Sequence, residues 1–154
     1  MKFCWAVKLE RMPQQPFHAE ARLRVRYAET DQMGVVYHAN YLIWFEVGRV
    51  ELMRSLGLAY ADLEKDYGCL IAVVSVEARY RASARYDDEI AVRTRITAMR
   101  GPVLKMAYEV VRVEDGKLLC EGSTSHVVVS REMTKRELPE PYAQAFRKLL
   151  EKED

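Results

Sequence analysis

A fifteen-residue run near the start of the chain combines residue types that can hydrolyse a reactive ester. From Tyr27 to Tyr41 it contains a carboxylate (Asp31), a glycine (Gly34), a histidine (His38) and the expected start of a helix. The first N–H groups of a helix have no partner within it and point back toward the preceding loop. Such groups can stabilise a developing oxyanion while a nearby carboxylate attacks or activates water. The run is therefore a candidate hydrolytic site.

Both polar side chains of this run also have simpler interpretations. An Asp ahead of a helix is often only an N-cap or a turn residue. A histidine near a helix start can be packed or hydrogen-bonded without taking part in chemistry. Spacing alone therefore leaves the roles of Asp31 and His38 open.

The helix that must position this run is predicted over residues 40–56 and is expected to be buried over most of its surface. One stripe of it carries Tyr41, Phe45, Gly48, Leu52 and Leu56. The other faces are also rich in apolar residues, which a helix wrapped by a sheet needs and a surface helix could not tolerate. Gly57 is a typical C-terminal cap. Gly48 predicts a close approach of the helix backbone to another element.

The remaining periodicity predicts one antiparallel sheet. Period-two alternation and hairpin signals indicate strands over residues 21–27, 70–80, 89–98, 103–113 and 117–129. Short connections at residues 100–102 and 115–116 require antiparallel neighbours. Short helices are expected over residues 60–66 and 142–152. The order predicts an α+β fold in which one antiparallel sheet curls around one long central helix.

Composition narrows the classes of partner. The chain has 154 residues, with 24 Lys and Arg against 23 Asp and Glu, a net charge of +1. Neither nucleic acid nor an anionic membrane would be attracted at long range. Signal-peptide patterning is missing, and no apolar run reaches the roughly 20 residues of a membrane span. We expect a cytoplasmic protein without membrane insertion.

Cysteine and histidine spacing indicates no metal site and no cofactor. The three cysteines, Cys4, Cys69 and Cys120, are widely separated, which suits a reducing compartment. His18, His38 and His126 likewise lack metal-ligand spacing. Residues 1–19 show no sustained periodicity and are predicted to be an N-terminal extension, followed by a single domain over residues 20–154.

One longer pattern resembles a known family. Residues Tyr27 to Arg49 follow Y-x-x-T-D-x-x-G-V-V-Y-H-x-N-Y-L-x-W-F-E-x-x-R. This is similar to the signature of the 4-hydroxybenzoyl-CoA thioesterase family, and it is closest to the branch of small bacterial acyl-CoA thioesterases that includes the one encoded with the Tol-Pal system. Tyr80, residues 85–89 and residues 138–139 fit the same branch. The likeness covers about residues 22–150.

The resemblance implies a hotdog fold, hydrolysis of acyl-CoA thioesters to free acid and CoA, and a homodimer or homotetramer with sites where subunits meet. Asp31 matches the family's catalytic carboxylate, acting as general base or nucleophile. His38 matches the residue whose backbone N–H binds the thioester oxygen.

Three further residues match positions that bind or shape the substrate pocket: Tyr27, Asn40 and Glu46. Asn40 is as suitable for a helix cap as for a ligand. Glu46 and Arg49 occupy the family's Glu and Arg on the helix, and we expect them first to form a buried support pair.

Two alternatives remain at this point. A hotdog dehydratase acting on hydroxyacyl thioesters would pair His38 with Glu46, since one fold can host both reactions. A non-catalytic acyl-CoA binding module would keep the pocket and release no thiol. The loop that carries Asp31 favours hydrolysis.

Overall fold

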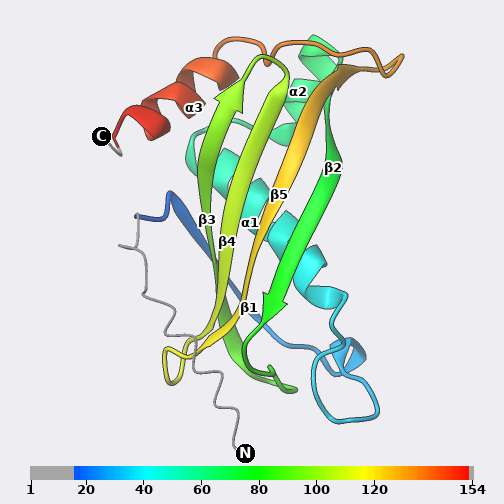
Figure 1. Ribbon diagram of the computed structural model, residues 1–154, viewed down its shortest axis with the longest axis vertical. Coiled ribbons are helices and arrows are strands. Elements are labelled where there is room, and N and C mark those ends of the chain that lie inside the picture. Colours follow the sequence, from blue (N-terminus) through cyan, green and yellow to red (C-terminus); the bar gives the residue numbers. More distant parts are fainter. Residues whose placement is uncertain (1–15, 153–154) are drawn as a thin grey trace, which may run out of the picture.

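A long helix, α1 (Asn40–Ser55), lies across one face of a five-stranded antiparallel sheet in the computed structural model, which describes residues 16–152 (Figure 1). The strands are β1 (Ala19–Arg24), β2 (Cys69–Tyr80), β3 (Glu89–Arg100), β4 (Val103–Arg112) and β5 (Leu118–Ser130). Two short helices, α2 (Tyr60–Tyr67) and α3 (Tyr142–Glu151), complete the fold. The α+β prediction of a sheet around one central helix is confirmed.

The sheet order is β1-β3-β4-β5-β2. β3, β4 and β5 are consecutive hairpin neighbours, and Gly116 turns the β4–β5 hairpin with φ +67°. β2 pairs only with β5 among the described residues, so its other edge lies at the border of the sheet. β1 forms the opposite border beside β3.

The core lies between α1 and the inner face of the sheet. Phe45 stacks on Tyr108 of β4, with ring centroids 4.5 Å apart and planes 11° from parallel. Apolar side chains of the inner strands and of α1 are less than 2% exposed, among them Trp44, Phe45, Leu52, Ile90, Val92, Ile96, Leu104, Met106 and Val110. Their burial supplies the main force that holds the helix on the sheet.

Gly48 brings α1 into direct contact with the sheet, as its place in the apolar stripe predicts. A Cβ atom at Gly48 would lie 2.4 Å from Thr94 Oγ1 and 2.9 Å from Val92 Cγ1. Gly122 of β5 plays the complementary part, since a Cβ there would lie 2.5 Å from the Phe45 ring. These two glycines set how closely the helix approaches β3 and β5.

One predicted element ends early. The strand expected over residues 21–27 stops at Arg24, because the chain leaves the sheet where Val25 donates its N–H to the Asp88 carbonyl. Tyr27 lies beyond the strand in a 3-10 turn and is 78% exposed. The other expected helices and strands are present, with ends shifted by one or two residues.

The predicted N-terminal extension lies largely outside the described residues. Of that segment, His18 donates its backbone N–H to the Thr94 carbonyl, and Ala19 begins β1. Cys4 also lies outside the described residues, whereas Cys69 and Cys120 are free and buried. Within residues 16–152, no helix is long and apolar enough to cross a membrane.

Candidate active site

Asp31 lies in a tight turn between β1 and α1. Its backbone N–H donates to the Val35 carbonyl at 2.9 Å, and the Gly34 N–H donates to the Asp31 carbonyl at 3.0 Å. Gly34 adopts φ +72°, which suits glycine. The Asp31 carboxylate accepts the Met33 N–H through Oδ1 at 2.8 Å, while Oδ2 has no hydrogen bond within residues 16–152. Asp31 is thus a turn residue with one carboxylate oxygen still available.

Hydrogen bonds to the backbone of Glu29 close the base of the loop that carries Asp31. The Glu29 carbonyl accepts the Tyr37 N–H and the Asn40 side-chain amide, both at 2.9 Å. An isolated bridge between Thr30 and Val36 narrows the loop further. Asn40, predicted as a cap or a ligand, therefore ties the start of α1 to the base of this loop.

Glu29 also anchors the loop through its side chain, which is only 5% exposed. Its carboxylate accepts the Trp44 indole N–H at 3.1 Å and the Arg26 backbone N–H at 2.8 Å. Burial alone would raise the pKa of Glu29, but the hydrogen bonds from Arg26 and Trp44 outweigh it and lower the pKa. Sequence reasoning missed this residue. Glu29 accepts the backbone N–H three residues before it, as the acidic residue of a capping box does, but Arg26 has no side-chain acceptor to complete the box, so no sequence motif marked Glu29.

The start of α1 presents two adjacent backbone donors. The helix begins with i to i+3 hydrogen bonds, from Asn40 N–H to Tyr37 at 3.0 Å and from Tyr41 N–H to His38 at 3.4 Å. The N–H groups of His38 and Ala39 have no acceptor in the part of the chain that the structure describes. The His38 imidazole is exposed and lies beside the Tyr37 ring, with centroids 4.5 Å apart.

The segment that follows β2 supports the Asp31 loop from the other side. Ala84 accepts the Val36 N–H through its carbonyl at 2.9 Å and donates its own N–H to the Tyr41 hydroxyl at 3.0 Å. Ala84 therefore links the loop, α1 and this segment. Tyr41 is 2% exposed, so the link is shielded from water.

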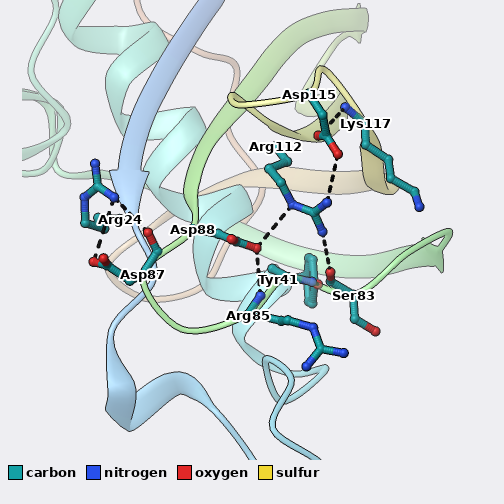
Figure 2. A network of polar contacts seen from close by, with 10 residues as sticks. Arg24, Tyr41, Ser83, Arg85, Asp87, Asp88, Arg112, Asp115 and Lys117 are labelled. Atoms are coloured by element: carbon teal, nitrogen blue, oxygen red, sulfur yellow. Dashed lines mark hydrogen bonds and ion pairs between the residues drawn. The ribbon is translucent and has the colours of Figure 1, made fainter.

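Arg112 fixes this supporting segment to the β4–β5 hairpin (Figure 2). Its guanidinium donates to Asp88 at 3.2 Å, to Asp115 at 3.0 Å and to the Ser83 carbonyl at 2.9 Å. Asp88 also accepts the Arg85 backbone N–H at 2.9 Å. A chain of polar contacts therefore runs from the hairpin turn to the neighbour of Ala84.

The predicted pairing of Glu46 with Arg49 is wrong. Glu46 is exposed, and Arg49 turns toward the sheet, where its Nη1 lies 3.4 Å from the Tyr108 hydroxyl. No ion pair joins the two side chains in the described part of the chain, although both line a groove of about 240 Å³ between α1 and β2. Glu46 lies about 9 Å along the helix from Asn40, given a rise of about 1.5 Å per residue.

A buried polar chain continues from Arg49 into the sheet. The Tyr108 hydroxyl is 2.7 Å from Thr124 Oγ1, which is 2.7 Å from His126 Nε2. His126 is fully buried, and its Nδ1 has no hydrogen-bond partner within residues 16–152. Burial, with a smaller effect of the Arg49 charge, lowers the pKa of His126 to about 4. The imidazole is therefore neutral at physiological pH.

The predicted site residues thus divide into two groups. Asp31, His38 and Asn40 belong to one loop and helix start, with Tyr27 at the edge of it, where its ring contacts Tyr86 with centroids 5.7 Å apart. Glu46 lies on a different part of α1. Among residues 16–152, no group of three His, Cys, Asp or Glu side chains could hold a metal ion.

Comparison with known proteins gives consistent matches. The profile of the Thioesterase-like superfamily matches residues 25–146. YneP of Bacillus subtilis, named provisionally as an acyl-CoA thioesterase, is 39% identical over 128 residues, 83% of this chain and 89% of YneP. The acyl-CoA thioester hydrolase YbgC of Escherichia coli O157:H7 is 34% identical over 126 residues, 81% of this chain and 92% of YbgC. The crystal structure of a DHNA-CoA thioesterase from Staphylococcus aureus superposes with a TM-score of 0.81 at 31% identity, over 86% of this chain and 91% of that one.

Proposed function

The chain belongs to the Thioesterase-like superfamily, and we propose from this that it is an acyl-CoA thioesterase, which hydrolyses acyl-CoA to a free acid and CoA. The observation that carries the proposal is that the Asp31 loop and the start of α1 offer, within residues 16–152, both a carboxylate oxygen without a hydrogen bond (Asp31 Oδ2) and two N–H groups without an acceptor (His38 and Ala39). Hydrolysis of a thioester needs both an activated oxygen nucleophile and a site for the oxyanion.

In the mechanism we favour, Asp31 Oδ2 acts as a general base. It accepts a proton from a water molecule whose oxygen attacks the thioester carbon. The N–H groups of His38 and Ala39 donate to the carbonyl oxygen as it becomes negative. When the tetrahedral intermediate collapses, the C–S bond breaks, and the CoA thiolate takes the proton that Asp31 accepted from water, so CoA leaves as the thiol and the Asp31 carboxylate is restored. The alternative, direct attack by Asp31 to form an acyl anhydride that water then opens, gives the same products.

Asp31→Asn tests the role of the carboxylate. The amide oxygen can still accept the Met33 N–H, so the turn should survive, but the amide can neither deprotonate water nor attack the thioester. We expect kcat to fall by about 10²-fold or more, with an unchanged circular dichroism spectrum and melting temperature. Asp62→Asn, an exposed aspartate on α2, is the matched control. Near wild-type turnover in Asp31→Asn would show that Asp31 is only a turn residue.

Single-turnover hydrolysis in ¹⁸O water can reveal a nucleophilic Asp31. Enzyme is held in excess, and the peptide that contains Asp31 is analysed by mass spectrometry. A label in Asp31 identifies an anhydride intermediate that water opens at the Asp31 carbonyl. A general base directs the label only to the acid product, and so does an anhydride that water opens at the acyl carbonyl. We expect the label in the product alone.

The same proposal assigns the secondary roles. The backbone of His38 supplies a donor that His38→Ala retains, so this variant should lose less turnover than Asp31→Asn. Equal losses would show that the imidazole takes part in the chemistry. Tyr27 and Asn40 shape the mouth of the site, and Asn40 does so by holding Glu29 and α1 together.

We further propose that the active form is a homodimer or a homotetramer. The free edge of β2 exposes Val73, Val74 and Val76, and the adjacent face of α1 exposes Leu42, Ile43 and Val47. Pairing of two β2 edges would extend the sheet and cover this apolar surface. Glu46, remote from the Asp31 loop of its own subunit, would then serve the site of the other subunit. A stable, fully active monomer near 17.9 kDa in light scattering would contradict this assembly.

The proposal also includes the family and the branch to which the chain belongs within the superfamily. We assign the chain to the 4-hydroxybenzoyl-CoA thioesterase family and to the branch with the Tol-Pal thioesterase. A thiol-release assay with aryl-CoA and fatty acyl-CoA substrates tests this assignment. The same assay separates hydrolysis from the two alternatives, since neither a dehydratase nor a binding module releases free CoA.

A further inference from the structure

Tyr80, the last residue of β2, reaches across to the start of α1. Its hydroxyl donates to the His38 carbonyl at 3.0 Å. Its ring meets the rings of His38 and Tyr41 edge-on, with centroids 6.2 and 5.3 Å apart. Edge-on packing of this kind orients an aromatic side chain. The position of the hydroxyl is thus set by two ring contacts as well as by the strand.

The acceptor of this hydrogen bond belongs to the peptide group that carries one of the two free donors. The His38 carbonyl and the Ala39 N–H are the two ends of one rigid planar unit. A hydrogen bond to the carbonyl polarises that unit and strengthens its N–H as a donor. It also fixes the tilt of the peptide plane, and therefore the direction in which the Ala39 N–H points.

Among residues 16–152, no other strong contact holds the His38 carbonyl. Its hydrogen bond within the helix start, from the Tyr41 N–H, is 3.4 Å long, at the weak end of the range. The contact from Tyr80 is shorter and comes from a different element. The end of β2 is itself held, because Arg81 and Ala82 both donate their N–H groups to the Leu119 carbonyl of β5, at 2.8 and 3.1 Å.

We propose that Tyr80 is a positioning residue for thioester hydrolysis, whose hydroxyl orients and polarises the His38–Ala39 peptide that receives the oxyanion. The inference rests on the proposed function and adds to it a residue on a different strand. Because β2 also carries the proposed subunit contact, Tyr80 links that contact to the oxyanion site.

Tyr80→Phe removes the hydroxyl and keeps the ring, so the ring contacts remain. Removing a direct oxyanion donor costs about 10²- to 10³-fold in kcat, and an indirect contact should cost less, on the order of 10-fold. We expect KM to change by less than about twofold and the melting temperature to stay constant, because Tyr80 is 46% exposed. Tyr67→Phe is the matched control, a tyrosine of similar exposure (40%) on α2, and it should match the wild type.

A second readout follows the peptide itself without any substrate. In ¹H–¹⁵N spectra, the Ala39 amide resonance should move in Tyr80→Phe and stay in place in Tyr67→Phe. A merely structural role for Tyr80 would lower the melting temperature and would leave kcat of the folded fraction unchanged.

The outcomes separate this inference from the proposed function. If the wild type releases CoA and Tyr80→Phe keeps a kcat within twofold of it, the positioning role is refuted while the function stands. If KM rises and kcat is unchanged, Tyr80 contacts the substrate instead, and the inference is again wrong. If the wild type releases no CoA from any acyl-CoA tested, the proposed function fails, and the positioning role fails with it.

Discussion

Gly48→Ala tests the contact that fixes the depth of α1 on the sheet. The added methyl carbon would lie 2.4 Å from Thr94 Oγ1 and 2.9 Å from Val92 Cγ1, both well inside ordinary contact distance. Thr94 and Val92 are fully buried, so neither can move into solvent. Because real Cβ contacts are almost never this short, either the helix or these two packed side chains must shift.

Two opposing effects determine how much unfolding free energy Gly48→Ala should lose. Forcing an extra methyl group into a packed core costs up to about 3 kcal/mol. Replacing Gly by Ala inside a helix returns about 1 kcal/mol. The net loss of unfolding free energy should therefore be about 2 kcal/mol, measured by urea denaturation at a fixed protomer concentration.

A double-mutant cycle with Thr94→Ala makes this test specific. Thr94 Oγ1 has no hydrogen-bond partner within residues 16–152, so its removal costs little beyond the lost methyl group. Once it is gone, the nearest remaining atom of residue 94 would be Cβ at 3.7 Å, an ordinary contact. Gly48→Ala should then cost at least 1 kcal/mol less in the Thr94→Ala background, which is a coupling typical of residues in contact. Additive effects, or a Gly48→Ala variant as stable as the wild type, would refute the argument.

Three further predictions concern buried titratable groups and metal dependence. Because the pKa of His126 is lowered to about 4, the unfolded chain binds a proton that the folded chain does not. Stability should therefore fall between about pH 6.5 and pH 4, by roughly 3 kcal/mol at most, and His126→Gln should flatten that loss in urea titrations. Glu29 has a lowered pKa, so the stability that its carboxylate contributes is fully present above the ordinary Glu pKa of 4.5. That stability is lost as the pH falls below 4.5. Glu29→Gln should cost about 2 kcal/mol at pH 7, with a smaller difference from the wild type in acid; an equal difference at both pH values would contradict the assignment. Acyl-CoA hydrolysis should survive exhaustive EDTA treatment, and a loss that zinc restores would overturn the mechanism.

The fold was predictable because its patterns are local. Alternation in β3, the hairpin signal at residues 115–116 and the apolar stripe of α1 each follow from nearest neighbours in the sequence. Gly48 indicated a close approach without naming the partner. The partners are Thr94 and Val92, and the sequence could not identify them because their position depends on the pairing of strands that are far apart in the chain.

The candidate site was less predictable, since its support comes from long-range contacts. The Asp31 turn and the helix start were expected from the sequence, and their roles in catalysis stay predictions. The anchoring by Glu29 and the hydrogen bond from Tyr80 to His38 depend on tertiary packing. The pairing of Glu46 with Arg49, expected from the family resemblance, failed because a spacing of three residues on a helix permits an ion pair without requiring one. Arg49 donates to the Tyr108 hydroxyl instead.

Because the edge of β2 is unpaired, the yield of correctly assembled protein should depend on the relative rates of subunit pairing and of misassociation. A newly folded subunit displays a border strand of twelve residues, and any extended chain can add to such a border. Productive pairing and misassociation then compete at every encounter between chains. Glu77 and Arg79 place charges on the last part of this border, and charges of this kind discourage wrong partners. The stretch from Val73 to Val76 has no such protection, so it is where aggregation would begin when partners of the right kind are scarce.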